Sequence, residues 1–456
     1  MATDGLAASV EKMRGEGLPQ IAIDTFEHYY RLLASGERGL LPESDLEPVE
    51  ELPEASELPE PRSAEALDAA VVIKLNGGLG TSMGMDRAKS LIEAKDGLTF
   101  LDIAVRQVLH LRESSGARLP LVLMNSFYTR EDTLRALERY PELEADVPLD
   151  FVQGKVPKLR ADDLTPVEWP EDPALEWAPP GHGDLYTALA TSGMLERLLE
   201  RGYRYAFVSN SDNLGAVLEP RILDWFARER LPFVMEVTDR TESDRKGGHI
   251  ARRRGDGLVL REIAQTPDGD LDAFQDVARH RFFNANSLWL DLRALRDTLE
   301  ARDGVLGLPM IVNSKTVDPS DSSSPEVFQL ETAMGAAIGA IEGAAALHVP
   351  RSRFAPVKTT DQLLAVRSDA FVLRADASVD LAPGRDGRPP VVELDPSHYK
   401  LLRDFEAHFP AGPASLVACE RLEVVGDVTF GRGVVVRGSV RVTGPRRVED
   451  GAVLEG

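Results

Sequence analysis

The chain alternates short apolar runs with stretches of helical periodicity between about residues 68 and 367. The apolar runs are rich in β-branched and aromatic residues, and five of them are predicted to be strands: 70–75, 121–125, 205–210, 233–238 and 282–290. Strands that alternate with helices are typical of an α/β fold with a parallel sheet covered by helices. Ligands bind beyond the carboxyl ends of the strands in such sheets, so the residues that follow these runs are the first candidates for a site.

The first 65 residues have a different pattern. The segment Thr25–Leu33 carries large side chains at helical spacing on one side: Phe26, Tyr29, Tyr30 and Leu33. This spacing predicts a helix that packs on the main domain. Residues 42–61 are acidic and rich in proline, which discourages helix and sheet, so an extended, solvated connector is expected there.

The pattern changes again after about residue 391. A helical stretch over residues 398–409 is followed by short apolar runs punctuated by glycine, LEVVGDVTFGRGVVVRGSVRV. Repeated short strands with glycine turns indicate the coils of a β-helix. We therefore divide the chain into an N-terminal helical segment with its connector (1–65), a main α/β domain (66–390) and a small β-helix domain (391–456).

Composition narrows the functional class. A net charge of −23 argues against a protein whose role is to bind nucleic acid or an anionic membrane surface. The single cysteine, Cys419, excludes an internal disulfide framework and a zinc site built on several thiolates, and it fits a reducing compartment, so a cytoplasmic protein is expected. The N-terminal residues lack the apolar region of a signal peptide, and the most apolar later stretch, 334–347, is too short to span a bilayer.

A glycine-rich loop follows the first predicted strand, in VVIKLNGGLGTSMGMDRAKS. A strand that opens into Gly77, Gly78 and Gly80 presents backbone N–H groups that phosphate or a base can approach, and Lys89 follows within reach. The spacing fits neither a Walker A loop nor a dinucleotide fingerprint, whose third glycine would fall on Met83. Taken alone, such a loop can also be an ordinary turn.

Two further segments carry candidate chemistry. In WAPPGHGD (177–184), two prolines stiffen a loop and two glycines flank His182, which suits contacts to a base or a phosphate; the alternative is a structural histidine. In YAFVSNSDN (205–213), a predicted strand ends in polar residues that include Asp212. Mg²⁺ prefers oxygen ligands, so Asp212 is the best candidate for a metal ligand, the alternative being a turn-capping side chain.

Eight segments, in this order, resemble the UDP-glucose pyrophosphorylases of the eukaryotic type. They are LNGGLGTSMG with Lys89, PPGHGD, FVSNSDNLGA, MEVTDRTESDRKGG, LREIAQTP, FFNANSLW, FQLETAMGAAI and VPRSRFAPVKTTDQLL, which together cover about residues 71–364. The tail LEVVGDVTFGRGVVVRGSV is similar to the left-handed β-helix domain of that family. For the main domain the resemblance implies a GT-A-like, Rossmann-like nucleotidyltransferase fold with a mixed, mostly parallel sheet.

The resemblance also implies which residues meet the nucleotide. The loop Leu75, Asn76, Gly77 and Gly78 would receive uracil and ribose, Gly181 the base, and His182 and Lys89 the phosphates. Gln153 matches the family glutamine that recognises uracil. A carboxamide both donates and accepts a hydrogen bond, so Gln153 can read the O4 and N3–H edge of uracil but not the reversed pattern of cytosine in the same pose.

The other half of the implied site holds the sugar phosphate and a Mg²⁺ ion. Asn210 and Asp212 would lie at the sugar phosphate and the metal, while the sugar hydroxyls would meet Glu262, Asn284, Asn286 and Glu331. Lys358, in FAPVKTT, is similar to the family lysine that binds the phosphoryl group in transfer. Lys89, Asp212 and Lys358 are thus the expected catalytic residues.

Three positions depart from the family pattern. Met85-Asp86-Arg87-Ala88 stands where the family has Cys-Lys-Gly-Pro, which changes the charge and rigidity of the loop before Lys89. Ser287 replaces the last asparagine of the usual NTNN cluster. The sequence ends at Gly456 without the final strand-like segment of the family, so we expect a monomer or a homo-oligomer formed through the C-terminal domain.

The expected reaction is the attack of a glucose 1-phosphate oxygen on the α-phosphorus of UTP, giving UDP-glucose and pyrophosphate. The attacking phosphate is already ionised, so positioning and charge neutralisation suffice and no general base is required. Two alternatives stay open at this point. One is a pyrophosphorylase for another sugar 1-phosphate, such as galactose or N-acetylhexosamine 1-phosphate; the other is a non-catalytic nucleotide-sugar sensor, which would not need the three catalytic residues together.

Overall fold

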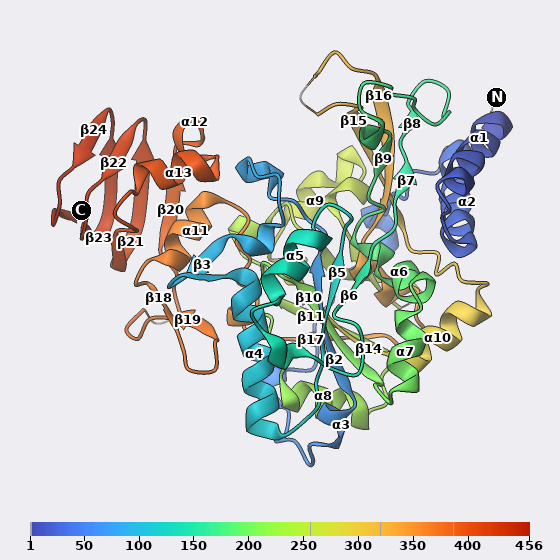
Figure 1. Ribbon diagram of the computed structural model, residues 1–456, viewed down its shortest axis with the longest axis horizontal. Coiled ribbons are helices and arrows are strands. Elements are labelled where there is room, and N and C mark those ends of the chain that lie inside the picture. Colours follow the sequence, from blue (N-terminus) through green and yellow to red (C-terminus); the bar gives the residue numbers. More distant parts are fainter. Residues whose placement is uncertain (1, 256, 320, 386) are drawn as a thin grey trace.

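A ten-stranded mixed sheet forms the centre of the molecule (Figure 1). The computed structural model describes residues 2–255, 257–319, 321–385 and 387–456. Neighbouring strands follow the order β1-β12-β14-β10-β2-β5-β6, and β11, β13 and β17 join off this path. The strands are β1 (Leu46–Glu47), β2 (Ala70–Asn76), β5 (Leu121–Asn125), β6 (Asp150–Val152), β10 (Tyr205–Asn210), β11 (Phe233–Asp239), β12 (His249–Arg253), β13 (Leu258–Arg261), β14 (Phe282–Asp291) and β17 (Ala345–His348).

Helices cover both faces of this sheet because successive side chains of a strand point to opposite faces. In β2, Val71 and Ile73 pack with side chains of α6, α7 and α10, whereas Val72 packs with those of α3, α4 and α8 (Figure 1). The helices of this unit are α3 (Glu65–Asp68), α4 (Phe100–Ser115), α5 (Arg130–Leu137), α6 (Leu185–Thr191), α7 (Met194–Glu200), α8 (Pro220–Arg228), α9 (Leu271–Gln275) and α10 (Leu292–Ala301). The α/β class predicted from the hydrophobic pattern is confirmed.

All five predicted strands are present, as β2, β5, β10, β11 and β14. The expectation that most pairs are parallel is not met, because β14 runs antiparallel to β10, β11 and β12. The strands β10, β2, β5 and β6 form a parallel group on one side of β14. This group brings the carboxyl ends of β2 and β10 side by side, which positions the candidate site.

The predicted N-terminal helix is confirmed as α2 (Gln20–Ala34), and it follows α1 (Ala2–Gly15). Phe26, Tyr29, Tyr30 and Leu33 are all buried. They pack against a three-stranded sheet that projects from the body beside these helices (Figure 1). The small strands of this region are β7 (Val156–Pro157), β8 (Leu159–Arg160), β9 (Trp177–Ala178), β15 (Met310–Thr316) and β16 (Glu326–Thr332). A separate two-stranded sheet consists of β3 (Glu93–Lys95) and β4 (Leu98–Thr99).

The acidic segment 42–61 is extended in part but is not the solvated connector that its composition predicts. Leu46 and Val49 are buried, and β1 adds to the edge strand β12. The carboxylate of Glu43 accepts a hydrogen bond from the fully buried Arg261 at 2.5 Å. The segment is held in place because it supplies backbone partners to a sheet edge and a counter-charge to a buried arginine.

Parallel strands form the C-terminal unit, in one sheet of four strands and one sheet of two. The predicted helical stretch 398–409 consists of two short helices, α12 (Pro396–Tyr399) and α13 (Leu402–His408). The other elements are α11 (Thr360–Arg367), β18 (Phe371–Leu373), β19 (Val379–Leu381), β20 (Val391–Leu394), β21 (Ser415–Val425), β22 (Val428–Phe430), β23 (Val435–Thr443), β24 (Arg446–Val448) and β25 (Val453–Glu455). The core of this unit is continuous with Met83 and Ile92, which flank the glycine-rich loop. Within the described part of the chain, no helix combines the length and hydropathy needed to cross a membrane.

Candidate active site

The glycine-rich loop and the polar segment after β10 lie next to each other. β2 and β10 are parallel neighbours, with Leu75 opposite Asn210. The backbone N–H of Ser211 donates to the carbonyl oxygen of Leu75 at 3.1 Å, which extends the pairing past the ends of both strands. The parallel register therefore places two of the predicted motifs at one edge of the sheet, as sequence reasoning anticipated.

Lys89 and Asp212 meet at this edge. The Nζ atom of Lys89 lies 2.5 Å from Oδ2 of Asp212, and each side chain keeps less than a fifth of its surface exposed. The Lys89 backbone N–H donates to the carbonyl oxygen of Gly78, so the loop itself positions the lysine. The second carboxylate oxygen, Oδ1 of Asp212, is buried and has no hydrogen-bond partner among the described residues. A buried acceptor of this kind fits a hard cation such as Mg²⁺.

The segment that carries Lys358 lies at the same edge of the sheet, because it is hydrogen-bonded to the residues that follow β10. The Val357 N–H donates to the carbonyl oxygen of Asp212 at 3.2 Å. The side chain of Asn213 donates to the Arg353 carbonyl and accepts from the Ala355 N–H. Lys358 is exposed, and its backbone N–H is held by the side chain of Gln362 at 2.6 Å. Its charge also acts to lower the pKa of both His182 and Glu262, on which burial has the larger effect.

His182 is held as a neutral hydrogen-bond donor. The backbone N–H of Met334 donates to Nδ1 at 3.0 Å, so the proton of the neutral ring is on Nε2. Burial and the nearby charge of Lys358 lower the pKa of His182 to about 4. The preceding residue is necessarily glycine, since Gly181 has φ +78° and a Cβ atom there would lie 2.5 Å from the carbonyl oxygen of Thr332.

The side chain of Gln153 packs against Gly77 of the glycine-rich loop. Its backbone N–H donates to the carbonyl oxygen of Asn125 at 2.8 Å, and a Cβ on Gly77 would lie only 2.6 Å from its Oε1. The structure therefore brings the predicted uracil reader to the predicted uridine loop. The side chain of Asn76 points elsewhere, because it donates to the side chains of Asn125 and Thr133 inside the protein.

The predicted sugar ligands Asn284 and Asn286 share a bulge in β14. Asn286 has φ +52°, and the two side chains are joined by a hydrogen bond of 3.0 Å from Nδ2 of Asn284 to Oδ1 of Asn286. The pairing with β11 shifts register at this point, so the two side chains depart from the regular alternation between the faces of the sheet. Glu262 is near, since it lies against Gly248, whose carbonyl accepts from the Asn284 N–H. Burial raises the pKa of Glu262 to about 7, although Lys358 and Arg240 oppose the shift.

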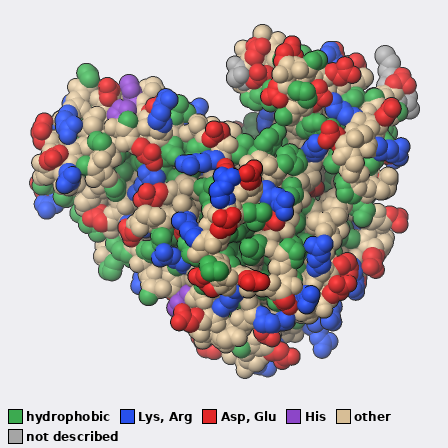
Figure 2. Space-filling view, viewed as in Figure 1, with side chains coloured by type: hydrophobic (Ala, Val, Ile, Leu, Met, Phe, Trp, Pro, Cys, Tyr) green, Lys and Arg blue, Asp and Glu red, His purple; other side chains and the backbone are tan. Residues whose placement is uncertain are grey.

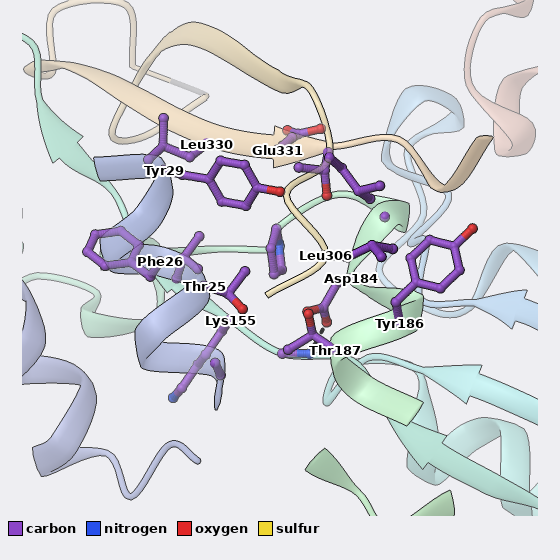
Figure 3. Close-up of a pocket in the computed structure, with 17 residues that line it drawn as sticks. Thr25, Phe26, Tyr29, Lys155, Asp184, Tyr186, Thr187, Leu306, Leu330 and Glu331 are labelled. Atoms are coloured by element: carbon purple, nitrogen blue, oxygen red, sulfur yellow. Dashed lines mark hydrogen bonds between the residues drawn. The ribbon is translucent and has the colours of Figure 1, made fainter. Parts of the chain in front are cut away.

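Glu331, another predicted sugar residue, lies beside the His182 loop, because a Cβ atom on Gly181 would lie 3.0 Å from its Cβ. It lines a cavity with Tyr29, Lys155 and Asp184, between α2 and the loop that carries Gly154 (Figure 3). The volume of this cavity is about 40 Å³. A cavity needs roughly 10–15 Å³ of such space to hold one water molecule, so this one has room for a few waters.

Sequence reasoning did not single out Asp184, the residue that ties two halves of the site together. Its Oδ2 accepts a 2.5 Å hydrogen bond from the Gly154 N–H, next to Gln153, while its backbone belongs to the loop of His182 (Figure 3). The motif PPGHGD does contain this carboxylate, two residues after the histidine.

Replacing Asp184 with asparagine should change how the stability of the protein depends on pH. Burial raises the pKa of Asp184 from 3.8 to about 7, against the hydrogen bond from Gly154. Because the folded pKa is the higher one, the carboxyl stabilises the fold fully below its unfolded pKa, and this contribution is lost as the pH rises through about 7. The melting temperature of the wild type should therefore fall relative to that of the variant between these values. Melting curves that run parallel over this window would contradict the argument.

A buried charge network supports the Lys358 segment and was also missed. Arg353 donates to both oxygens of Glu236, at 2.9 and 2.6 Å, and the indole N–H of Trp289 donates to Glu236 at 2.9 Å. Lys74 is buried beside them, and burial together with Arg353 lowers its pKa to about 7. Charged residues inside the apolar runs VVIKLN and FVMEVTD were the available signal.

The surface between the C-terminal unit and the β15–β16 projection is hollowed. Figure 2 shows the C-terminal unit and the β15–β16 projection standing apart from each other, with Lys and Arg side chains on the body between them. Local positive charge in such a hollow attracts polyanions even when the whole chain is acidic, because charges beyond about 8 Å are screened in physiological salt.

Comparison with known proteins gives consistent results. The sequence model of the family described as UTP–glucose-1-phosphate uridylyltransferase matches residues 23–437. The UTP–glucose-1-phosphate uridylyltransferase of Solanum tuberosum is 41% identical over 413 residues, covering 89% of this chain and 84% of the potato protein. A crystal structure of a mutant UDP-glucose pyrophosphorylase from Leishmania major in complex with UDP-glucose matches with a TM-score of 0.94 and 46% identity, covering 99% of this chain and 98% of that one. A structure from Trypanosoma brucei matches with a TM-score of 0.92 and 45% identity over 99% of this chain and 98% of that one.

Proposed function

This chain belongs to the UTP–glucose-1-phosphate uridylyltransferase family, and from that premise we infer that it joins UTP to glucose 1-phosphate, giving UDP-glucose and pyrophosphate. The observation that carries the assignment to this site is the meeting of Lys89, Asp212 and the Lys358 segment at one edge of the sheet. Two cations and a carboxylate with a free oxygen suit two phosphorylated substrates and a divalent metal ion.

The transfer is an in-line displacement. An oxygen of glucose 1-phosphate forms a bond to the α-phosphorus of UTP, and the bond from that phosphorus to the bridging oxygen breaks, so that pyrophosphate leaves with the electron pair. We assign Lys89 to the triphosphate and Lys358 to the phosphoryl group in transfer. His182 donates its Nε2 proton in a hydrogen bond to a phosphate oxygen, since its Nδ1 is already occupied. These groups stabilise the charge that develops in the transition state.

The remaining predicted residues position the two ends of the substrates. Gln153, against Gly77, reads the uracil edge, while the backbone of the loop Leu75, Asn76, Gly77, Gly78 and that of Gly181 face the uridine. Asn210 lies at the sugar phosphate, and Asn284, Asn286 and Glu262 meet the glucose hydroxyls. Glu331 is a further candidate for the sugar site, and its Cβ would lie 3.0 Å from a Cβ on Gly181.

We propose Asp212 as the protein ligand of a Mg²⁺ ion. Its Oδ1 atom is buried without a donor, which is the arrangement that a bound cation completes. When bound, Mg²⁺ supplies neutralisation of the phosphate charge. Lys89 occupies the other oxygen of the carboxylate and keeps it oriented.

Replacing Asp212 with asparagine should raise the Mg²⁺ concentration needed for half-maximal activity while the protein stays folded. The amide keeps the shape of the side chain but removes the charge that attracts a hard cation. Mg²⁺ titrations of activity, with circular dichroism as the check on folding, measure this. Asp297→Asn makes the same change in charge at an exposed position on α10, and its titration should match that of the wild type. An unchanged titration for Asp212→Asn would remove the metal assignment.

The function is tested by following pyrophosphate release with UTP and a panel of sugar 1-phosphates. We expect glucose 1-phosphate to give the highest kcat/KM, with galactose 1-phosphate and N-acetylhexosamine 1-phosphates lower. A preference for another sugar would mean that Asn284 and Asn286 select the hydroxyl pattern of that sugar and not that of glucose. Binding of UDP-glucose without turnover of any pair would favour the alternative of a non-catalytic sensor.

Three structural features complete the proposal. The main domain (66–390) is GT-A-like, and the parallel coils of the C-terminal domain (391–456) form a left-handed β-helix. The N-terminal segment (1–65) supports the nucleotide side through the packing of α2. The chain acts as a monomer or as a homo-oligomer formed through the C-terminal domain.

A further inference from the structure

A cluster of two histidines and an aspartate lies in the C-terminal unit, apart from the reaction site. His398 belongs to α12, His408 ends α13, and Asp427 precedes β22. One possible ligand atom from each residue lies within 4.8 Å of the others. Figure 2 shows histidine side chains gathered at the surface over this part of the molecule. Nothing in the proposed transfer reaction uses these residues.

The hydrogen bonds of His408 call for a positive charge, either on the ring or next to it. Its Nδ1 atom is 2.6 Å from the carbonyl oxygen of Asp404, and a carbonyl can only accept, so Nδ1 carries a proton. Its Nε2 atom is 3.1 Å from Oδ1 of Asp427. In a neutral ring, Nε2 would turn its lone pair toward a carboxylate oxygen. Either a second proton or a metal ion between Nε2 and Oδ1 resolves this conflict.

The position of His398 favours the metal ion. A proton shared by His408 and Asp427 needs no third group, yet the ring of His398 stands 6.2 Å from that of His408, centroid to centroid. The Asp404 carbonyl meanwhile fixes the tautomer of His408 in the way that outer partners of metal-binding histidines do. Donor separations of about 3.3 Å follow from tetrahedral geometry with zinc bonds of about 2.0–2.1 Å, close to the 3.1 Å already present between Nε2 and Oδ1.

Ring packing and hydrogen bonds hold the backbone around the cluster in place. The ring of Tyr399, next to His398, is buried and stacks at a tilt on His408 with centroids 4.5 Å apart. Its hydroxyl donates to the carbonyl oxygen of Val428 at 2.5 Å. The backbone of Asp427 accepts from the Arg446 N–H of the next coil. The backbone that carries the three residues is therefore held in place, with their ligand atoms already within 4.8 Å of one another.

We propose that His398, His408 and Asp427 bind one Zn²⁺ ion, which fastens α12 and α13 to the coils of the C-terminal unit. Two imidazoles and a carboxylate are a donor set of zinc, whereas Mg²⁺ prefers oxygen alone. Water completes the tetrahedron on the exposed side. The ion stabilises the packing of the two helices on the coils, and its site is separate from the Mg²⁺ site at Asp212.

The test uses the full chain, freed of metal with EDTA and then titrated with ZnCl₂. We expect one equivalent of Zn²⁺ to bind in calorimetry and the melting temperature to rise by on the order of 5 °C at saturation. A Co²⁺-loaded sample should show the visible absorption of a tetrahedral site. His408→Gln and Asp427→Asn should lose all three signals.

His398→Gln is the decisive variant, because it leaves the His408–Asp427 contact intact. It should melt like the wild type without metal and should not respond to Zn²⁺. His110→Gln, at an exposed histidine on α4, and Asp212→Asn should both keep the full response. If the wild type fails to bind Zn²⁺, or if His398→Gln responds as the wild type does, the cluster is only an ion pair of His408 with Asp427 and the proposal is wrong.

Discussion

Replacing Lys358 with alanine should lower kcat by about 10²–10³-fold, the range found when one preorganised donor to a developing negative charge is removed. The dissociation constant of UTP should change much less. The Lys358 side chain is exposed, and its charge acts on the pKa of both His182 and Glu262. Its charge therefore matters most when negative charge moves between the two substrates.

Steady-state kinetics distinguishes this role from simple binding. If the contact exists only in the transition state, kcat and kcat/KM fall by the same factor. Lys358→Arg keeps the charge and should recover part of the rate. Lys400→Ala removes an exposed lysine near α12 and should behave as the wild type. A near-normal kcat in Lys358→Ala would rule out the assigned role.

Removing the carboxylate of Glu236 should cost roughly 3–5 kcal/mol of stability, as expected when one partner of a buried ion pair is deleted. Glu236 is fully buried and accepts from Arg353 twice and from Trp289 once. Burial disfavours the charged form of Arg353, but Glu236 outweighs this and raises its pKa. In Glu236→Ala that guanidinium would stay buried without its counter-charge.

Chemical denaturation of the full chain measures the effect. Glu393→Ala removes a carboxylate from an exposed pair with Arg421 and should change the unfolding free energy by less than about 0.5 kcal/mol. Glu236→Ala should also lower kcat, because the Arg353 carbonyl holds Asn213 beside Asp212. Equal stabilities for the two variants would mean that Arg353 finds another partner or reaches water.

Local patterns were sufficient for the elements and for the family. Strands such as 121–125 and 205–210 were predicted with their observed ends, because a buried strand needs an unbroken apolar run and polar residues mark where it stops. The order of motifs indicated the chemistry, since each motif is a short local pattern, and several are loops whose backbone is set by their own glycines and prolines. The direction of β14 could not be predicted in this way, because strand pairing depends on residues far apart in sequence.

Long-range pairing also explains the residues that were missed or misread. The segment 42–61 looks solvated by composition, yet Leu46 and Glu43 gain a sheet edge and a buried arginine as partners only after folding. Arg353 looks like a surface residue until Glu236, more than a hundred positions earlier, is placed opposite it. The free energy of a charge depends on its surroundings, and the sequence does not list those surroundings.

The sequence by itself determined the α/β class, the strands, the family and the candidate residues, because these depend on hydrophobic period and on short motifs with their own backbone geometry. Only the tertiary structure decided that Lys89 pairs with one oxygen of Asp212 and leaves the other free, and that Asp184 joins the loops of Gln153 and His182. Such contacts are set by the parallel register of β2 and β10 and by the packing of distant loops on their ends, and no local pattern encodes that packing.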